Sequence, residues 1–415
     1  MTRYVPLSEL RVYYHRTPDE RALVGRLAYR ENRAAFEYDA DFRALGLELS
    51  PFRLALTEGL VLARPDFFEG LFGLFDDSLP DGWGRLLLDR HVASLGVNHR
   101  ELTPLDRLAW VGSRAIGALS YQPERELESP DTIDLHALGE AAQTVLEDGT
   151  SNALETLLSV GGSPQGARPK ALVLIDRSGN QIVAGAESRE GFAPYLVKFS
   201  VSRDPKDSVG ATEFAYSNMA RAAGVAMPNT RLLAASGKHR GFFAIERFDR
   251  RGAQRIHTHT VSGLLDAPPL HTSITYEDLI KVTQRLTRDA RQVKQMFRRA
   301  TFNVYAHNRD DHSRNFAFLM EPDGTWKLAP AYDLTFSDGP GGEHTMLVGG
   351  EGRNPTENNL LGLAGVAGIK PAEAEQIIEE VRTACGEWGT FAEQAKVPEK
   401  DNDRIETALA RIRAL

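Results

Sequence analysis

The chain has 415 residues, a formal net charge of −8 and a mean hydropathy of −0.33. Its 42% hydrophobic and 26% charged residues argue against a disordered or membrane-embedded protein, and no apolar run approaches the roughly 18 residues that span a bilayer. The acidic balance argues against a dedicated nucleic-acid binder, and the only cysteine, Cys385, excludes an intrachain disulfide and a thiolate metal cluster. Since the N-terminus also lacks the pattern of a signal peptide, we expect a cytoplasmic globular protein of two or three lobes without membrane contact.

Three regions of different character follow one another along the chain. Residues 1–105 mix short alternating stretches and proline-bounded turns with the helical run "DGWGRLLLDRHVASLGV". Residues 106–249 contain the β-rich segments "KALVLID" and "APYLVKFS", interrupted by one helix at "GATEFAYSNMARAAGVAMP". Residues 250–415 are mainly helical. The pattern predicts a front domain, a β-rich lobe and an α-helical lobe, with these boundaries.

A glycine-rich stretch precedes the first β-rich segment. In "SVGGSPQGARPKALVLI", three glycines (Gly161, Gly162 and Gly166) and two cations (Arg168 and Lys170) stand ahead of a strand. Backbone N–H groups at glycines can approach an anion closely, so the stretch is a candidate phosphate site. It is not a Walker A sequence, because no G-K-[ST] follows the glycines. The alternative is a flexible surface loop.

A strand lysine and a helix glutamate follow the glycine stretch. Lys198 ends the apolar strand "PYLVK", and Glu213 lies on the inward face of the next helix, where an ionised carboxylate is costly unless it is paired. A strand lysine paired with a helix glutamate holds nucleotide phosphates in protein kinases. Taken alone, Lys198 is more typical of an edge or snorkelling lysine.

The segment "GFFAIERFDR" closes the β-rich lobe, where a kinase hinge would run. In such a hinge, backbone groups bond adenine while side chains such as that of Phe248 pack near it. The alternative is that Glu246, Arg247, Asp249 and Arg250 only form surface ion pairs.

The most concentrated polar stretch is "HNRDDHSRN", which holds four charged residues, two histidines and two asparagines. Asp310 and Asn315 have the D-x-x-x-x-N spacing of a kinase catalytic loop, in which a carboxylate meets the acceptor hydroxyl and an amide oxygen binds magnesium. A solvated turn after a helix is the alternative.

A predicted hairpin follows this loop. "NFAFLM", the turn "EPDGT" and "WKLAPAYD" predict two strands, the second of which ends on Asp333 and returns a carboxylate towards Asn315. Carboxylate and amide oxygens that converge beside phosphates suit Mg²⁺. Asp333 could equally be a strand-terminating aspartate that bonds its own turn.

At these residues the chain resembles the HipA family of bacterial serine/threonine kinases, which serve as toxins of toxin–antitoxin modules. The motifs that carry the resemblance are "NRDDHSRNF", "LAPAYD", "ERFDR" and the front element "FDDSLPDGWGRLLLD". The resemblance implies an α+β, bilobal, protein-kinase-like fold with an additional N-terminal α/β subdomain and an all-α C-terminal lobe. It covers most of the chain.

The resemblance also implies roles for single residues. Asp310 would be the catalytic base and Lys198 the phosphate-binding lysine, Asn315 and Asp333 would hold Mg²⁺, and Glu213 would form a structural ion pair. The residues expected at ATP are Gly161, Gly162, Ser163, Gly166, Lys170, Lys198, Glu246, Phe248 and His312. His312 would chiefly brace the loop. Because family members autophosphorylate a glycine-loop serine and so silence themselves, Ser159 and Ser163 are the two candidates.

The sequence therefore predicts an ATP- and Mg²⁺-dependent protein serine/threonine kinase, expected to arrest growth by phosphorylating a translation-related protein such as an aminoacyl-tRNA synthetase. A HipB-like helix-turn-helix antitoxin would be its partner, with DNA reached only through that antitoxin. Two alternatives stay open. One is a metal-dependent phosphohydrolase with Asp310, Asp311, His312 and Asp333 as ligands, and the other is a catalytically silent binding module or co-repressor.

Overall fold

The structure is a computed structural model that describes residues 4–128, 132–147, 153–161, 165–179, 181–185, 188–200, 208–234, 241–268 and 274–413. It divides into two compact units. The first comprises Met1–Arg203, Ala244–Asp266 and Leu319–Gly324, and the second comprises Asp204–Phe243, Ala267–Phe318 and Thr325–Leu415. No helix in the described ranges is long and apolar enough to cross a membrane.

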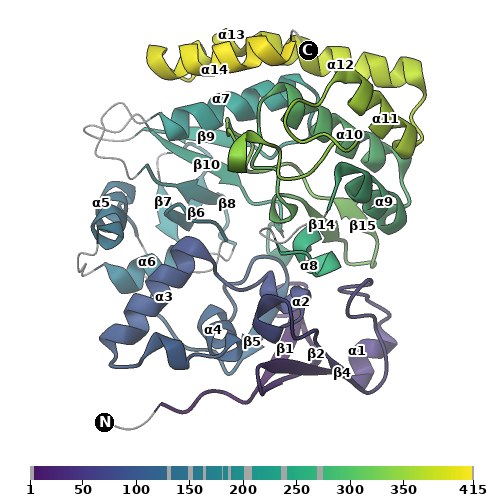
Figure 1. Cartoon of the computed structure of the whole chain (residues 1–415). Helices are drawn as coiled ribbons and strands as arrows, with labels where there is room; N and C mark the ends of the chain where they lie inside the picture. Colours follow the sequence, from purple (N-terminus) through teal and green to yellow (C-terminus); the bar gives the residue numbers. More distant parts are fainter. Residues whose placement is uncertain are drawn as a thin grey trace. The chain divides into compact units, whose positions relative to one another are not determined.

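The first unit combines two larger β-sheets with several helices (Figure 1). Its elements are β1 (Glu9–His15), β2 (Arg21–Arg30), β3 (Arg33–Tyr38), α1 (Ala40–Ala44), β4 (Leu60–Leu62), α2 (Gly73–Asp76), α3 (Gly82–Ser94), α4 (Pro104–Val111), β5 (Leu119–Gln122), α5 (Leu135–Leu146), α6 (Leu154–Gly161), β6 (Lys170–Asp176), β7 (Ile182–Ala184), β8 (Phe192–Lys198), β11 (Arg250–Arg251), β12 (Gln254–Arg255), β13 (His257–Thr260) and α8 (Val261–Leu265).

The N-terminal sheet has the strand order β4-β3-β2-β1-β5. Strands β2 and β3 are joined by Glu31 and Asn32, which both have positive φ, as a type I′ hairpin turn requires. Alternate residues of β1 are buried, and the aromatic rings of Phe36, Phe75 and Tyr121 pack against one another in the core. This sheet and its helices account for the mixed character of the first hundred residues.

The second sheet of the first unit is built on the two predicted β-rich segments. "KALVLID" forms β6 and "APYLVK" lies within β8, so both predicted strands are confirmed. Within this unit the strand order is β7-β6-β8-β10, and β10 (Phe242–Glu246) contributes its last three residues. In the antiparallel register of β6 and β8, Lys170 lies opposite Lys198.

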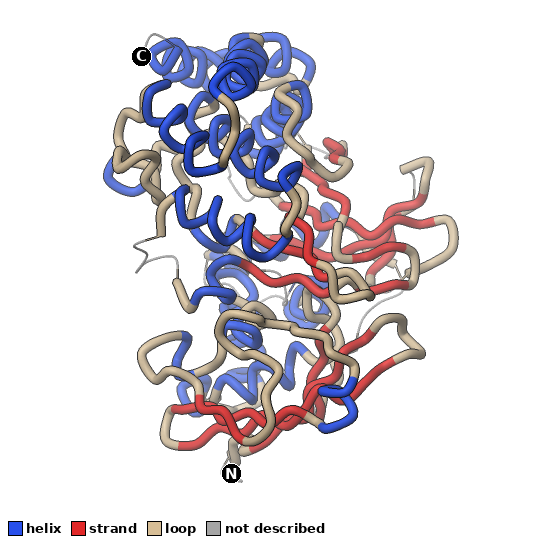
Figure 2. Tube along the Cα trace, turned by 90° about the vertical axis from the view of Figure 1, so that its right-hand side faces the viewer, coloured by secondary structure: helices blue, strands red, loops and turns tan. Residues whose placement is uncertain are grey.

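The second unit is mainly helical, and helices predominate towards the C-terminus in Figure 2. Its elements are α7 (Val209–Ala222), β9 (Thr230–Leu233), α9 (Tyr276–Thr287), α10 (Ala290–Tyr305), β15 (Trp326–Leu328), α11 (Glu357–Ala367), α12 (Pro371–Gly386), α13 (Trp388–Gln394) and α14 (Glu399–Arg413), with the start of β10 and of β14 (Ala317–Met320).

Helix α10 lies at the centre of this unit, against α9, α11 and α12. Asp289 caps its N-terminus by accepting a hydrogen bond from the N–H of Arg291, and the buried side chains of α10 form a largely apolar face. At its C-terminal end, the Tyr216 hydroxyl of α7 donates to the carbonyl of Ala306 over 2.8 Å, and the Tyr216 ring packs on Trp388. The end of α10 is therefore fixed in place.

The predicted hairpin is present as β14 and β15, but its second strand ends at Leu328 and not at Asp333. The sequence "LAPAYD" contains Pro330, which has no backbone N–H to donate to a sheet. The chain therefore leaves the sheet before it reaches Asp333. The region 250–415 is also not all-α, because β11, β12, β13 and this hairpin belong to it.

Candidate active site

The polar loop of the second unit begins where α10 ends. His307 has φ +50°, a left-handed conformation that turns the chain out of the helix, and Asn308 then forms a parallel bridge with Ser337. A single 3₁₀ turn, Ser313–Asn315, returns the chain to β14. The loop is thus held at both ends by regular structure.

Asp310, His312 and Asn315 come together within this loop. The Asp310 side chain is 58% exposed, and the nearest ring nitrogen of His312 lies 3.8 Å from its carboxylate, which is too far for a hydrogen bond. Asn315 is buried, and its amide nitrogen donates to the carbonyl of Asp310 over 2.7 Å. Because no described residue donates to the amide oxygen Oδ1, that oxygen remains available to a cation. Asp310 is accessible to an incoming hydroxyl.

Asp311 is turned the other way, into the interior of the second unit. Its carboxylate accepts hydrogen bonds from the Tyr276 hydroxyl, from Nδ1 of His344 and from the N–H of Thr345, each over 2.7 Å. Burial, and then the Asp311 charge, raise the pKa of the Tyr276 phenol well above its usual value. Among the described residues, no group of three or more His, Cys, Asp and Glu side chains could hold a metal ion.

Asp333 and Asn315 lie on segments that share contacts. The Tyr332 hydroxyl donates to the carbonyl of Arg314 over 2.6 Å, and Asp333 follows in a left-handed conformation, φ +56°. Arg299 of α10, which is 2% exposed, donates to the carbonyl of Asn315. Its guanidinium lies 4.4 Å from the centre of the Phe316 ring and 5.6 Å from that of Tyr332.

Arg299 is not among the predicted site residues, although it stands three residues after Met296 on the buried face of α10. Burial lowers its pKa to about 10, while Tyr332, Tyr276 and Asp333 act in the opposite direction. The residue therefore remains a buried cation at neutral pH. Because a buried charge is costly unless polar groups surround it, an arginine among buried apolar residues indicates that polar groups pack against this face of the helix.

In the first unit, Lys170 and Lys198 are cross-strand partners and so project from the same face of the sheet. Lys170 is buried, and its ammonium donates to the carbonyl of Gln165. The register thus brings together the two lysines that were predicted separately.

The glycine stretch starts in a helix. Ser159 and Gly161 lie in the last turn of α6, where the Ser159 hydroxyl donates to the carbonyl of Thr156 over 2.9 Å. A Cβ at Gly161 would lie 2.2 Å from the carbonyl oxygen of Lys170, so this glycine permits close packing of α6 on β6. Gly162 and Ser163 lie outside the described residues.

The part of the stretch after residue 164 is fastened to the segment before α3. Asp81 accepts a hydrogen bond from the N–H of Gly166, and the carbonyl of Gly166 accepts one from the N–H of Trp83 over 3.1 Å. The Gln165 amide donates to the carbonyls of Asp76 and Leu79. The front motif "DDSLPDGW" therefore holds this loop, a role that its composition alone did not reveal.

Arg247, Asp249 and Arg250 of "ERFDR" form a buried ion-pair cluster and not a surface one. Asp249 is buried between the guanidinium groups of Arg247 and Arg250, each 2.7 Å from its carboxylate, and it also accepts from the N–H of Gly117. These arginines and the Gly117 N–H lower the pKa of Asp249 despite its burial. Arg255 donates to the carbonyl of Gly117. The motif locks residues 115–119 in place, while Glu246 and Phe248 at its start are partly exposed.

Lys198 and Glu213 lie in different units, at the end of β8 and within α7 respectively. Glu213 is buried in its helix. Their pairing stays a prediction.

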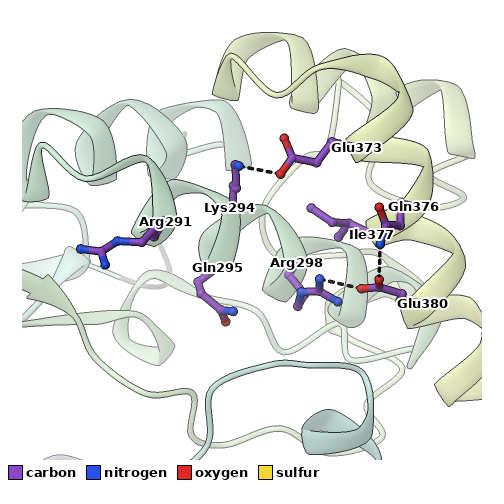
Figure 3. Close-up of a pocket in the computed structure, with 8 residues that line it drawn as sticks. All are labelled: Arg291, Lys294, Gln295, Arg298, Glu373, Gln376, Ile377 and Glu380. Carbon is purple, nitrogen blue, oxygen red and sulfur yellow. Dashed lines mark hydrogen bonds and ion pairs between the residues drawn. The ribbon is translucent and has the colours of Figure 1, made fainter.

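A surface pocket of the second unit lies between α10 and α12 (Figure 3). Lys294 pairs with Glu373 over 2.5 Å, and Arg298 pairs with Glu380 over 2.7 Å. The residues that line this pocket include none of the predicted site residues.

The chain matches two known families, the HipA N-terminal domain over residues 11–122 and the HipA-like C-terminal domain over residues 162–388. It is 30% identical over 294 residues to Y4mE of Sinorhizobium fredii, which carries the name "Putative kinase", and the alignment covers 65% of this chain and 63% of that protein. The chain thus spans less than two thirds of that relative's length.

A second relative is named "Serine/threonine-protein kinase toxin HipA" and comes from Shewanella oneidensis. It is 24% identical over 344 residues, which is 76% of this chain and 73% of that protein. Among solved structures, a chain from the complex of S. oneidensis HipA, HipB and operator DNA superposes with a TM-score of 0.65 at 18% identity, over 98% of this chain and 99% of that chain. This likeness shows a common fold and confirms the predicted HipA-like α+β architecture.

Proposed function

Since the chain belongs to the HipA family, whose relatives here are named as kinases, we propose that it is an ATP- and Mg²⁺-dependent protein serine/threonine kinase. The observation that carries the proposal is the loop of the second unit, in which an exposed Asp310 stands beside a buried Asn315 with a free amide oxygen. Asp310 would accept the proton of a serine or threonine hydroxyl as its oxygen bonds to the γ-phosphorus of ATP and the bond to ADP breaks.

The residues present fit a magnesium ion, because an amide oxygen of Asn315 and the carboxylate of Asp333 are hard oxygen ligands on adjoining segments. When bound, magnesium would neutralise charge on the phosphates. Lys170 and Lys198 would bind phosphate oxygens, and Gly161, Gly162, Ser163, Gly166, Glu246, Phe248 and His312 are the remaining proposed contacts of ATP. Glu213 would pair with Lys198.

The phosphohydrolase alternative is disfavoured by Asp311. That alternative requires Asp310, Asp311 and His312 on one metal ion, whereas the Asp311 carboxylate is already bonded to Tyr276, His344 and Thr345. A catalytically silent co-repressor would show no phosphate transfer from ATP, which distinguishes it from the proposed kinase.

The toxin role and its partners are part of the same proposal. The S. oneidensis structure is titled as a complex of HipA, HipB and operator DNA, which supports a HipB-like antitoxin as partner of this chain. The protein substrate would be translation-related, such as an aminoacyl-tRNA synthetase. Autophosphorylation would fall on Ser159 or Ser163. Modification of Ser159 requires its hydroxyl to leave the hydrogen bond that it donates to the carbonyl of Thr156.

The decisive test replaces Asp310 by asparagine, which keeps its shape and removes the base. Transfer of labelled phosphate from ATP to the chain itself and to serine-containing proteins should fall by about 10²- to 10⁴-fold, while stabilisation by Mg²⁺ and ATP in thermal unfolding persists. Asp403→Asn, at an exposed position of α14, is the matched control and should retain activity. Undiminished autophosphorylation in Asp310→Asn would remove Asp310 from the role of base.

A further inference from the structure

The residue before the proposed base is an arginine, Arg309. In protein kinases the catalytic loop carries the sequence H-R-D, and activation loops become ordered when a phosphorylated residue pairs with arginine. In this chain Asp333 is followed by Leu334, and residues 337–353 hold two hydroxyl residues, Ser337 and Thr345, that could receive such a phosphate. The contacts of Arg309 show whether this segment needs a phosphate to become ordered.

The guanidinium of Arg309 already holds this segment by its main chain. Nη1 donates to the carbonyl of Gly342 over 2.6 Å, and Nη2 donates to the carbonyl of Arg353 over 2.7 Å. The main chain of Arg309 adds three more hydrogen bonds, because its N–H donates to the carbonyl of Ser337 and its carbonyl accepts from both the hydroxyl and the N–H of Thr345. One residue thus binds both ends and the middle of residues 337–353, hereafter the 337–353 segment.

Asp311 provides a second, buried attachment. Its carboxylate holds the N–H of Thr345 and Nδ1 of His344, and it is itself fixed by the Tyr276 hydroxyl. Both Asp311 and His344 are buried. Hydrogen bonds between charged and polar groups in such a setting are stronger than exposed ones. The two residues that flank Asp310 therefore both attach to the same segment.

The glycines of "DGPGGEH" permit the close approach. Gly339 and Gly341 both have positive φ, but their surroundings differ. A Cβ at Gly339 would lie 2.6 Å from the Cβ of Arg309 and 2.1 Å from the carbonyl oxygen of Glu343, whereas a Cβ at Gly341 would meet no atom within 4 Å. Gly339 is thus required by packing on Arg309, in addition to its backbone conformation.

We propose that Arg309 and Asp311 are positioning residues that keep the 337–353 segment ordered beside Asp310 without phosphorylation, as a preformed platform for the acceptor polypeptide. The proposal rests on the proposed kinase function and extends it to regulation. The arginine that in other kinases would await a phosphate is already satisfied by neutral carbonyl groups. Control of this chain must then act elsewhere, and not through modification of this segment.

The attachment is tested by amide hydrogen exchange, which does not depend on activity. Arg309→Met should accelerate exchange at the N–H groups of Glu343, His344 and Thr345 by about tenfold or more, while exchange in α12 is unchanged. Arg353→Met is the matched control, because it removes an exposed cation of the segment and keeps the carbonyl that Arg309 binds. Equal exchange in the wild type and Arg309→Met overturns the proposal.

A glycine pair gives an independent check. Gly339→Ala should accelerate exchange in the same residues, whereas Gly341→Ala should do so less, because Gly341 lies in open space and its ψ of 11° strains alanine less than the ψ of 170° at Gly339. If the two variants behave alike, the packing of Gly339 on Arg309 does not hold the segment.

The effect on catalysis is measured with the full chain. Arg309→Met should lower kcat for phosphate transfer by between about ten- and a hundredfold with little change in the KM for ATP, and Arg309→Lys should recover part of it. Peptide mapping of active protein should find no phosphate on Ser337 or Thr345. Loss of activity on phosphatase treatment, traced to either residue, would overturn the proposal and leave the kinase function standing. A wild-type chain without transfer activity would instead refute the proposed function, and the exchange experiments would still test the attachment.

Discussion

Arg299 shows how one buried side chain can organise several segments. Its guanidinium contacts the carbonyl of Asn315 and the rings of Phe316 and Tyr332, so it links the two segments that carry the proposed magnesium ligands. A lysine could supply the charge but not the planar stacking surface or the fixed donor geometry.

Arg299→Lys should therefore lower the free energy of unfolding by about 1–3 kcal/mol and raise the Mg²⁺ concentration needed for ATP to stabilise the fold. Urea unfolding and thermal unfolding with ATP across a magnesium series measure the two effects. Arg291→Lys, in the same helix at an 87% exposed side chain, should change stability by less than about 0.5 kcal/mol. A change of the same size in both variants would contradict the special role of Arg299.

The lysine pair of the first unit makes a second prediction at this scale. Because Lys170 and Lys198 face each other across β6 and β8, inorganic phosphate or sulfate should raise Tm by binding between them. In Lys198→Met, the anion concentration needed for the same rise in Tm should be at least about tenfold higher, because one of the two positive charges is lost. Lys281→Met, at a 65% exposed side chain, is the control and should respond as the wild type does.

At the scale of elements, the residue that begins α3 uses its side chain to bind another segment and not its own helix. Asp81 is the N-cap residue of α3, yet its side chain makes no capping hydrogen bond and instead accepts from the N–H of Gly166. An N-cap carboxylate normally stabilises its own helix. The carboxylate of Asp81 is thus used to hold the loop that follows α6.

Asp81→Ala should release this loop. We expect faster hydrogen exchange at Gly166 and a higher KM for ATP, with little loss of helix stability. Asp134→Ala removes an ordinary cap, because Asp134 accepts from the N–H groups of His136 and Ala137, and it should destabilise α5 by about 1 kcal/mol without changing the KM. The reverse pattern would show that Asp81 acts only as a helix cap.

At the scale of the molecule, a buried histidine sets a limit on acid stability. His257 bonds the carbonyl of Leu49 in the interior of the first unit, and burial, followed by the nearby His259, lowers its pKa to about 3. Its pKa in the unfolded chain is about 6.5. As pH falls, His257 is therefore protonated in the unfolded chain before it is protonated in the folded protein. The stability that depends on neutral His257 is fully present above about pH 6.5 and is lost progressively below that pH.

The stability of the wild type should then decline below about pH 6.5 with a slope of up to about 1.4 kcal/mol per pH unit from this residue. His257→Gln keeps a donor for Leu49 but cannot titrate, so its stability should decline less steeply between about pH 6.5 and pH 4. Urea unfolding at a series of pH values measures both slopes. Parallel slopes in the two proteins would show that His257 does not titrate on unfolding.

Local patterns predicted a large part of the elements. Period-2 and period-3.6 patterns identified β6, β8 and α7, and turn residues identified the hairpin of β14 and β15. The extent of β15 was wrong because Pro330 and the left-handed Asp333 end the pairing early. The position of Ser159 in α6 was missed because the following glycines suggested a loop.

The sequence by itself determined the chemistry available to this protein, because the spacing of Asp310 and Asn315 puts a base and an amide in one short loop. Only the tertiary structure decided the direction of each side chain. Asp310 faces solvent while the neighbouring Asp311 is buried against Tyr276 and His344. A sequence does not distinguish two adjacent carboxylates. One is buried and the other exposed because hydrogen-bond partners distant in the chain offset the desolvation cost of only one of them.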